Sequence, residues 1–469
     1  MLFNTPIFFL FFSVFFFLYS FVLLRRRPRI LLILVGSLIF YAGWNYRFVP
    51  LLVFSATADY FLANSIAQAG NIRAKKLLLS VSVAINLGIL AIFKYADFAL
   101  QSVTDLLAAF GYHLSPPVLN FVLPVGISFY TFQSMSYTID VYRGQMKPHK
   151  GLLQFTAALA FFPQLVAGPI LRAREILPQL EDIPTPTWPG VKHGFLLITV
   201  GLFKKTLADL LAGRVDAVFN SGDPLSVLET WTGVLAFAAQ IYGDFSGYTD
   251  MAIGIALLLG FRIPINFCLP YFATSPVEFW RRWHISLSSW LRDYLYISLG
   301  GNRNHRYRNI FITMLLGGLW HGAAWTFIAW GFFHGCLIAA THWLSSLAVF
   351  RDLSESRRWI VRLPMWLGTF YLVLIGWVFF RAVSIESALS ILERMHGGYS
   401  HIQPANNSLL LAILCTAALV VMHLLDFVVL RWGGGIERRA WLLWPILLLL
   451  QFVCFFVGVP SDAFIYFQF

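Results

Sequence analysis

Residues 1–24 read MLFNTPIFFLFFSVFFFLYSFVLL, and the basic run Arg25-Arg26-Arg27-Pro28-Arg29 follows directly. In a cleaved signal peptide the positive charges come before the apolar segment, whereas here they come after it. Cytoplasmic loops of membrane proteins are enriched in Lys and Arg. This order therefore predicts a first membrane helix that starts outside the cell and has its basic end in the cytoplasm.

The composition of the whole chain also predicts a membrane protein. Of 469 residues, 58% are hydrophobic and 12% are charged, and the mean hydropathy is +0.71. A globular protein in water does not have this balance. The apolar stretches are long and continuous, which predicts spanning helices and not barrel strands. We therefore expect an all-α, polytopic integral membrane protein.

Charge and cysteine content argue against other classes of protein. The net charge of +12 comes from 34 Lys and Arg against 22 Asp and Glu. In such an apolar chain this excess indicates cytoplasmic loops, and we expect no nucleic-acid partner. The cysteines lie apart in apolar segments without a CxxC pair, so neither a disulfide framework nor a metal site is indicated.

Further apolar stretches predict about ten to twelve complete or partial membrane passages. They cover roughly 30–46, 48–66, 76–93, 119–141, 152–168, 194–212, 231–260, 309–345, 360–382, 408–430 and 441–460. Residues 309–345 are long enough for a helical hairpin, and the Pro- and Gly-broken segment 152–170 is expected to be re-entrant.

Basic clusters between these spans are expected in the cytoplasm. They are Arg73, Lys75 and Lys76; Arg143, Lys147 and Lys150; Arg303, Arg306 and Arg308; Arg351, Arg357 and Arg358; and Arg431, Arg438 and Arg439.

Two of the apolar segments contain polar residues that are costly in a bilayer and indicate function by default. The first is 123–143, which includes Gln133. The second is 240–250, in which Gly243 and Gly247 permit close helix approach beside Asp244 and Asp250. A purely structural role for these two acids is equally open, because buried acids also join helices.

A third segment, 275–322, contains most of the residues that suggest a chemical function. Ser275-Pro276-Val277-Glu278 is a capping box with proline at the first helical position, and it predicts a helix start. The helix is expected to be amphipathic, to continue to Tyr294 and to lie in the membrane interface. His284 falls on its apolar face and should point inward, where a structural histidine is the simpler interpretation.

His321 lies in Gly317-Gly318-Leu319-Trp320-His321-Gly322, within a predicted span that starts near Asn309. At 1.5 Å per residue it lies roughly 18 Å along the helix axis, past the middle of a hydrocarbon core about 30 Å thick. An imidazole titrates near neutrality, and the glycines are expected to leave room for a substrate. On the residues alone, catalysis, ion transport and a structural role remain open.

In these residues the chain resembles the membrane-bound O-acyltransferase (MBOAT) family, and within it the bacterial branch that acylates polysaccharides. The matching stretches are FWRRWHISL at 279–287, WLRDYLY at 290–296, GGNR at 300–303, GLWHG at 318–322, and the segments 240–250 and 123–143. The terminal stretches Met1–Asn4 and Phe464–Phe469 resemble the alginate-acetylating subgroup.

The resemblance implies that His321 is the catalytic histidine and that His284 occupies a second conserved polar position. It implies a single MBOAT domain over 1–469, with N-terminal helices in 1–118, a catalytic core in 119–345 and C-terminal helices in 346–469. These helices would surround a central tunnel in which a cytoplasmic thioester and an acceptor hydroxyl from outside meet at His321.

We expect His321 to deprotonate the acceptor hydroxyl, while His284 orients the base or stabilises the oxyanion. Asp244, Asp250, Trp320 and Gln133 are candidate supporting residues. The expected donor is acetyl-CoA, with a carrier-bound acyl group as the alternative. No bound cofactor is expected.

Arg292, Arg303, Arg306 and Arg308, with His305, are candidates for donor binding, although each is equally well explained as a topology signal. The expected partners are membrane lipid, a periplasmic transferase that receives the acyl group, and a polysaccharide as final acceptor. The expected location is the bacterial inner membrane.

Two hypotheses from other functional classes remain open. A secondary transporter would have midplane acids on broken helices and repeat symmetry between its halves, but the chain has no convincing repeat. A scaffold subunit of a polymer-export complex would leave the glycine-lined His321 unexplained.

Overall fold

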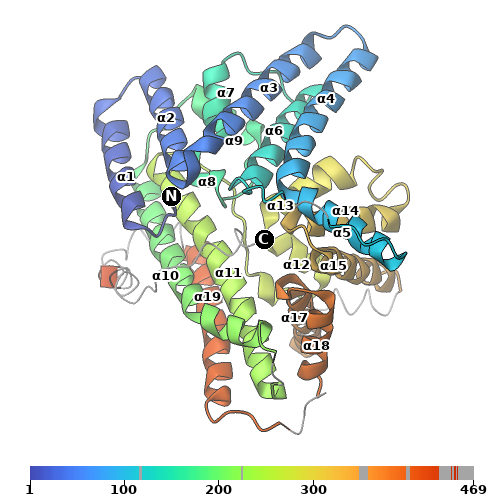
Figure 1. The fold of residues 1–469 in the computed structure, drawn as a ribbon. Helices are drawn as coiled ribbons and strands as arrows, with labels where there is room; N and C mark the ends of the chain where they lie inside the picture. Colours follow the sequence, from blue (N-terminus) through green and yellow to red (C-terminus); the bar gives the residue numbers. More distant parts are fainter. Residues whose placement is uncertain are drawn as a thin grey trace. The chain divides into compact units, whose positions relative to one another are not determined.

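The computed structural model describes residues 1–115, 119–222, 225–347, 358–397, 402–432, 445, 448, 449 and 452. All regular structure within these residues is helical (Figure 1), so the all-α prediction is confirmed. The chain divides into two compact units, one of residues 1–195 and 252–264 and the other of residues 196–251 and 265–469. The predicted span 441–460 lies outside the described residues except at the four isolated positions given above. Four arginines of the predicted basic clusters also lie outside them: Arg351, Arg357, Arg438 and Arg439.

The first unit is built from successive apolar helices. They are α1 (Pro6–Phe17) with the π turn Leu18–Val22, α2 (Arg26–Asn45), α3 (Val49–Gln68), α4 (Ile72–Leu90), α5 (Ala96–Ala109), α6 (Ile127–Tyr142), α7 (Leu152–Leu159), α8 (Phe162–Leu165) and α9 (Ala173–Glu181). Local signals set several helix starts: Pro6 opens α1, and the Asn71 side chain caps α4 by accepting a hydrogen bond from the Ala74 amide.

Two predicted spans of this unit are interrupted. The helix expected over 119–141 begins only at Ile127, because Gly126 has a left-handed φ of 75° and a Cβ there would lie 2.3 Å from the Leu165 carbonyl oxygen. The segment 152–170 breaks into α7 and α8 around Phe161, which confirms that it is a broken helix.

The second unit contains the remaining helices, and α10 and α11 begin or end in the first unit. They are α10 (Trp188–Phe219), α11 (Val227–Leu258), α12 (Pro276–Arg282), α13 (Ile285–Trp290), the π turn Leu291–Tyr296, α14 (Arg306–His321), α15 (Trp325–Leu344), α17 (Trp359–Arg381), α18 (Ile385–Met395) and α19 (Ser408–Trp432). Its core is rich in buried aromatic rings, among them Tyr242, Trp283, Trp330 and Trp377.

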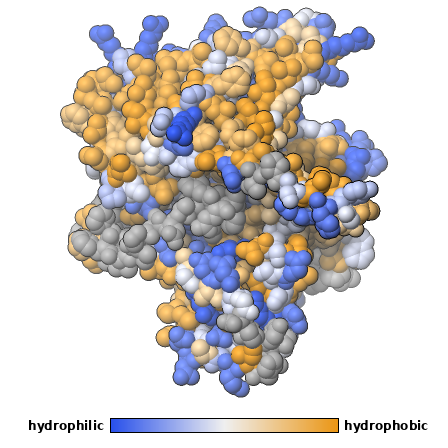
Figure 2. Space-filling model, in the orientation of Figure 1, coloured by the Kyte–Doolittle hydropathy of each residue, from blue (hydrophilic) through white to orange (hydrophobic). Residues whose placement is uncertain are grey.

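The protein is a multi-pass membrane protein. Within the described residues, five helical ranges are long and apolar enough to cross a bilayer: Arg26–Gln68, Ile72–Ala109, Trp325–Leu344, Trp359–Arg381 and Ser408–Leu430. The first two cover 43 and 38 residues and each contain more than one helix. Figure 2 shows broad hydrophobic surface on the first unit, as expected for helices that face lipid.

Candidate functional site

His321 is the last residue of α14, which forms a tight hairpin with α15. The hairpin predicted within 309–345 is therefore confirmed. The helices touch through glycines: a Cβ on Gly318 would lie 2.2 Å from the Phe327 carbonyl oxygen, and one on Gly331 would lie 2.4 Å from that of Met314. A Cβ on Gly322 would lie 2.0 Å from the Phe327 ring. The prediction that these glycines leave room for a substrate is thus wrong for Gly318 and Gly322, because α15 fills that space.

The His321 side chain is buried, with 4% of the residue exposed. Its ring centroid lies 5.1 Å from that of Trp330 and 5.2 Å from that of Phe380, both in edge-on arrangements. The neighbouring Trp320 ring is 5.0 Å away and is also buried. Aromatic edges around an imidazole restrict its orientation.

His284 lies in a bend and not inside a helix. Its φ of 44° is left-handed, which is rare for a residue other than glycine, and it separates α12 from α13. The predicted helix start is confirmed, since Ser275 accepts a hydrogen bond from the Glu278 amide. The prediction of one continuous helix to Tyr294 is wrong, but His284 does point inward and is fully buried.

Asn266, which the sequence did not single out, fixes this bend. Its Oδ1 atom lies 3.2 Å from Nδ1 of His284 and accepts hydrogen bonds from the amide and hydroxyl of Ser286, at 3.1 and 2.9 Å. Its carbonyl accepts a hydrogen bond from the Ile285 amide at 2.9 Å. Burial lowers the pKa of His284 to about 3, so the ring is neutral at physiological pH.

The fold brings the two predicted histidines together. Their ring centroids are 6.5 Å apart, although 37 positions separate them in the sequence. The Trp320 ring lies 5.9 Å from His284, and the Phe245 ring of α11 lies 4.6 Å from it. Three separate chain segments thus form one compact group of aromatic and imidazole rings.

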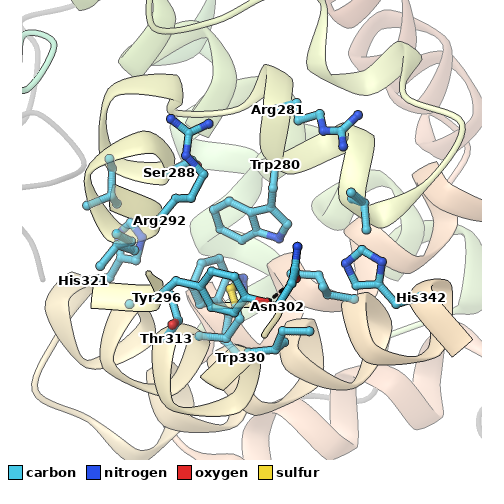
Figure 3. A pocket seen from close by; sticks show the side chains of 17 residues that line it. Trp280, Arg281, Ser288, Arg292, Tyr296, Asn302, Thr313, His321, Trp330 and His342 are labelled. Atoms are coloured by element: carbon cyan, nitrogen blue, oxygen red, sulfur yellow. Dashed lines mark hydrogen bonds between the residues drawn. The ribbon is translucent and has the colours of Figure 1, made fainter. Parts of the chain in front are cut away.

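His321 also lines a cavity of about 300 Å³ (Figure 3). The walls come from α12, α13, the π turn after it, α14 and α15. The polar lining residues are Arg281, Ser288, Arg292, Tyr296, Asn302, Thr313 and His342, and apolar residues that include Trp280, Leu287, Met314 and Trp330 complete the wall. Arg281 and Arg292 are exposed whereas His321 is buried, and Arg292 pairs with Asp293 at 2.7 Å. The cavity thus leads from exposed arginines to an imidazole.

The candidate donor-binding residues are divided by the structure. Arg292 lines the cavity, but Arg303, Arg306 and Arg308 are not among the described residues that line it. Arg308 instead contacts Oδ1 of Asn309, and Arg306 lies beside Tyr296. Sequence reasoning missed Arg281 as a cavity residue; its place on the same predicted helix as Arg292 was the available signal.

Asp244 and Asp250 lie in ion pairs between α10 and α11. The Lys205 ammonium is 2.8 Å from Asp244, and the Lys204 ammonium is 2.6 Å from Asp250. Lys204 also contacts Asp426 of α19, which in turn contacts the Tyr242 hydroxyl. These contacts fit the structural alternative. The signal that was missed is the presence of Lys204, Lys205 and Asp426 inside predicted spans, because charges in spans usually pair.

Gln133 lies in the first unit. Its Nε2 atom donates to the Ala158 carbonyl at 3.1 Å, and its Oε1 atom accepts from Gln164 at 2.7 Å. Gln133 thereby links α6 to the segment in which the helix is interrupted between α7 and α8. Close approach at Gly243 and Gly247 of the second unit is confirmed, since added Cβ atoms would lie 2.8 and 2.5 Å from carbonyl oxygens of α10.

Comparison with known proteins identifies the family. The model of the "MBOAT, membrane-bound O-acyltransferase family" matches residues 147–389, which include both histidines and the whole cavity. The "probable alginate O-acetylase AlgI" of Pseudomonas aeruginosa is 45% identical over 84% of this chain and 75% of its own length. The peptidoglycan O-acetyltransferase of Helicobacter pylori is 38% identical over 85% of this chain and 80% of its own length.

A more distant relative is the teichoic acid D-alanyltransferase of Streptococcus thermophilus, which is 31% identical over 48% of this chain and 58% of its own length. The family model covers more than half of the chain, and the nearer relatives cover most of it. The chain therefore belongs to the membrane-bound O-acyltransferase family and is an acyltransferase.

Proposed function

We propose that this protein is a membrane O-acetyltransferase that serves the acetylation of a cell-surface or exported polysaccharide, either alginate-like or peptidoglycan. The observation that carries the proposal is the buried His321 ring at the inner end of a cavity with Arg281 and Arg292 at its exposed end. The names of the alginate and peptidoglycan relatives support the acceptor class.

The proposed donor is the thioester of acetyl-CoA. Its phosphates carry negative charge that suits the exposed arginines, while its thioester end is small and apolar enough for the aromatic wall beside His321. The His321 imidazole takes the proton of the acceptor hydroxyl, and the oxygen attacks the thioester carbonyl. The carbon–sulfur bond then breaks, and the CoA thiolate leaves and takes up the proton.

In this proposal His284 assists without accepting the proton. Its low pKa keeps the ring neutral, and Oδ1 of Asn266 forms a hydrogen bond with its Nδ1 atom. A neutral imidazole 6.5 Å from His321, measured between ring centroids, is placed to hydrogen-bond an oxygen that lies between the two rings. That oxygen belongs to the acceptor hydroxyl, because the neutral ring donates its Nδ1–H to Oδ1 of Asn266 and its Nε2 can only accept a hydrogen bond.

The cavity supports a route by which a cytoplasmic donor would meet an acceptor from the other side. The basic segment 300–308 leads into α14, which begins at Arg306, and is predicted to be cytoplasmic. Because α14 has 16 residues, it is about 24 Å long, shorter than a hydrocarbon core of about 30 Å. His321 at its far end would meet an acceptor from the periplasm, on a polymer or on a separate periplasmic transferase.

Transfer of a D-alanyl group from a carrier protein is the alternative, and the Streptococcus relative is the observation that favours it. A secondary transporter would need acids that can exchange ions, but Asp244 and Asp250 form ion pairs with Lys205 and Lys204, respectively. Inner-membrane location remains a proposal that follows from the donor.

The deciding experiment uses inside-out vesicles with the protein in their membrane. Radiolabelled acetyl-CoA is added outside, at the cytoplasmic face, and alginate or peptidoglycan fragments are enclosed in the lumen, with and without periplasmic extract. We expect base-labile label on the polysaccharide, loss of it with His321→Ala, and retention with His113→Ala, an exposed histidine of the first unit. Label from a D-alanyl carrier but not from acetyl-CoA would favour the alternative, and equal labelling by His321→Ala would reject the proposal.

A further inference from the structure

A second cavity, of about 710 Å³, lies within the first unit and has no part in the proposed reaction. Its lining comes from the start of α2, the loop before α7 and the end of α9. The residues that line it are Arg26, Met146, Lys147, Pro148, His149, Lys150, Gly151, Gln154, Leu177, Pro178 and Glu181. A volume of this size suits a small ligand.

The cavity is strongly cationic. Arg26, Lys147 and Lys150 are exposed, and among the described residues no carboxylate pairs with either lysine. The single lining carboxylate, Glu181, is 3.1 Å from Nε2 of His149 and so is already engaged. Three cations face one paired acid, and this balance favours an anionic ligand.

The loop that carries the two lysines is held in place from several sides. The Tyr137 hydroxyl of α6 accepts a hydrogen bond from the amide of His149 at 2.9 Å. The Tyr60 hydroxyl of α3 donates to the carbonyl of Lys150 at 2.8 Å. The His149 ring is buried and contacts the amide of Gly151. The lysines therefore project from a fixed backbone, which lowers the entropic cost of binding an anion.

The position of the cavity identifies the kind of anion. Arg26 is the first residue of α2 and the first residue of a range that is apolar enough to cross the bilayer. Leu24 and Leu31, close to it in the sequence, are exposed apolar side chains. Because Arg26 stands at the start of a candidate span, a ligand here would meet cations with an apolar surface beside them, which is the pattern of a phospholipid-binding pocket.

We propose that this cavity binds the phosphate headgroup of an anionic phospholipid, with its acyl chains along the apolar residues beside Arg26. The phosphate oxygens accept hydrogen bonds from Arg26, Lys147 and Lys150. Free phosphate has the same chemistry at the headgroup but lacks the acyl chains, so the two sources can be separated by experiment.

The test uses the purified full-length protein in neutral detergent, with lipid binding followed by native mass spectrometry. Cardiolipin and phosphatidylcholine are compared on the wild type and on a triple variant, Arg26→Gln, Lys147→Gln and Lys150→Gln. The matched control is Arg73→Gln, Lys75→Gln and Lys76→Gln, which removes the same charge from another basic cluster. Single Lys147→Gln and Lys150→Gln variants cover the case in which the triple variant does not fold.

We expect cardiolipin to bind the wild type and the control in preference to phosphatidylcholine. The cavity variant should bind it on the order of 100-fold more weakly, and each single variant several-fold more weakly. Equal binding of both lipids, or equal loss in both triple variants, would overturn the site. Displacement of cardiolipin by millimolar inorganic phosphate alone would reject a phospholipid as the ligand and would identify a soluble phosphate in its place.

Discussion

The Oδ1 atom of Asn266 lies 3.2 Å from Nδ1 of His284. The same oxygen accepts two hydrogen bonds from Ser286. One amide therefore holds the bend in which His284 has a left-handed backbone, and it sets the direction of the ring toward His321. Asn266 is a positioning residue, because its contacts reach the proposed reaction centre only through His284.

Asn266→Ala should lower kcat about 10- to 100-fold with little change in KM, since loss of one buried hydrogen-bond partner costs about 1–3 kcal/mol. Steady-state acetyl transfer by purified protein measures this effect. Because Asn266 acts through His284, the double variant Asn266→Ala, His284→Asn should be no slower than the slower single variant. Multiplicative losses would show that Asn266 acts on its own.

His321 and His284 should differ in how their loss affects the reaction. His321→Ala or His321→Asn should leave no transfer above background, whereas His284→Asn should keep measurable turnover after a loss of about 10²–10³. Burial keeps His284 neutral, with a pKa of about 3. Its replacement should therefore lower the pH–rate profile without moving the acid limb between pH 5 and 8.

Equal and complete loss from both single variants would mean that the two rings act as one catalytic unit. A shift of the acid limb in His284→Asn would mean that His284 itself titrates during catalysis.

Local signals in the sequence predicted the elements but not the joints between them. Apolar length predicted the long helices, and the Ser275–Glu278 pair predicted the start of α12 because a cap acts within one turn. The bend at His284 was missed because it depends on Asn266, which is 18 positions earlier and lies in a loop with no periodic pattern.

Ion pairs between distant segments could also not be predicted from the sequence. The contact between Lys204 and Asp426 joins residues 222 positions apart, and nothing local distinguishes a paired intramembrane acid from a catalytic one. The burial of His321 could be predicted because it lies within a long apolar segment, but its ring neighbours Trp330 and Phe380 could not. The cavity lining could not, since it gathers side chains from five elements.

Lys204→Met should strongly destabilise the protein. Lys204 is almost fully buried between Asp250 and Asp426, so its loss leaves two largely buried carboxylates without their cation, at a cost of about 3–5 kcal/mol. The thermal midpoint in detergent should fall, and adding Asp250→Asn should restore part of it. Lys76→Met, at an exposed position, is the matched control. A midpoint close to the control would show that the pair contributes little.

Cysteines at Arg27 and Asn304 should resist an impermeant thiol reagent added to intact spheroplasts, because both lie in basic segments that are predicted to be cytoplasmic. A cysteine at His113 lies between the predicted spans 76–93 and 119–141, three predicted crossings after Arg27, so it should react and serves as the positive control. All three positions are exposed. The native cysteines are first replaced by serine. Labelling at Arg27 or Asn304 would reverse the orientation and with it the side from which the donor enters.

The way in which the donor enters can be tested with two pairs of arginines that carry the same charge. Arg281 and Arg292 line the cavity that reaches His321, whereas Arg303 and Arg308 are exposed residues outside that lining. Arg306 belongs to neither pair, because it lies beside the cavity residue Tyr296. Only the cavity pair is placed to meet the phosphates of a bound thioester.

Arg281→Gln with Arg292→Gln should raise the KM for acetyl-CoA about 3- to 30-fold and change kcat little, since contacts with the remote part of a substrate give uniform binding. The KM should also become less sensitive to salt, because exposed charges are screened over about 8–10 Å at physiological ionic strength. Arg303→Gln with Arg308→Gln should keep the wild-type KM and salt dependence. The opposite result would place the donor's phosphates on the basic loop 300–308 and assign the arginines of the cavity to another role.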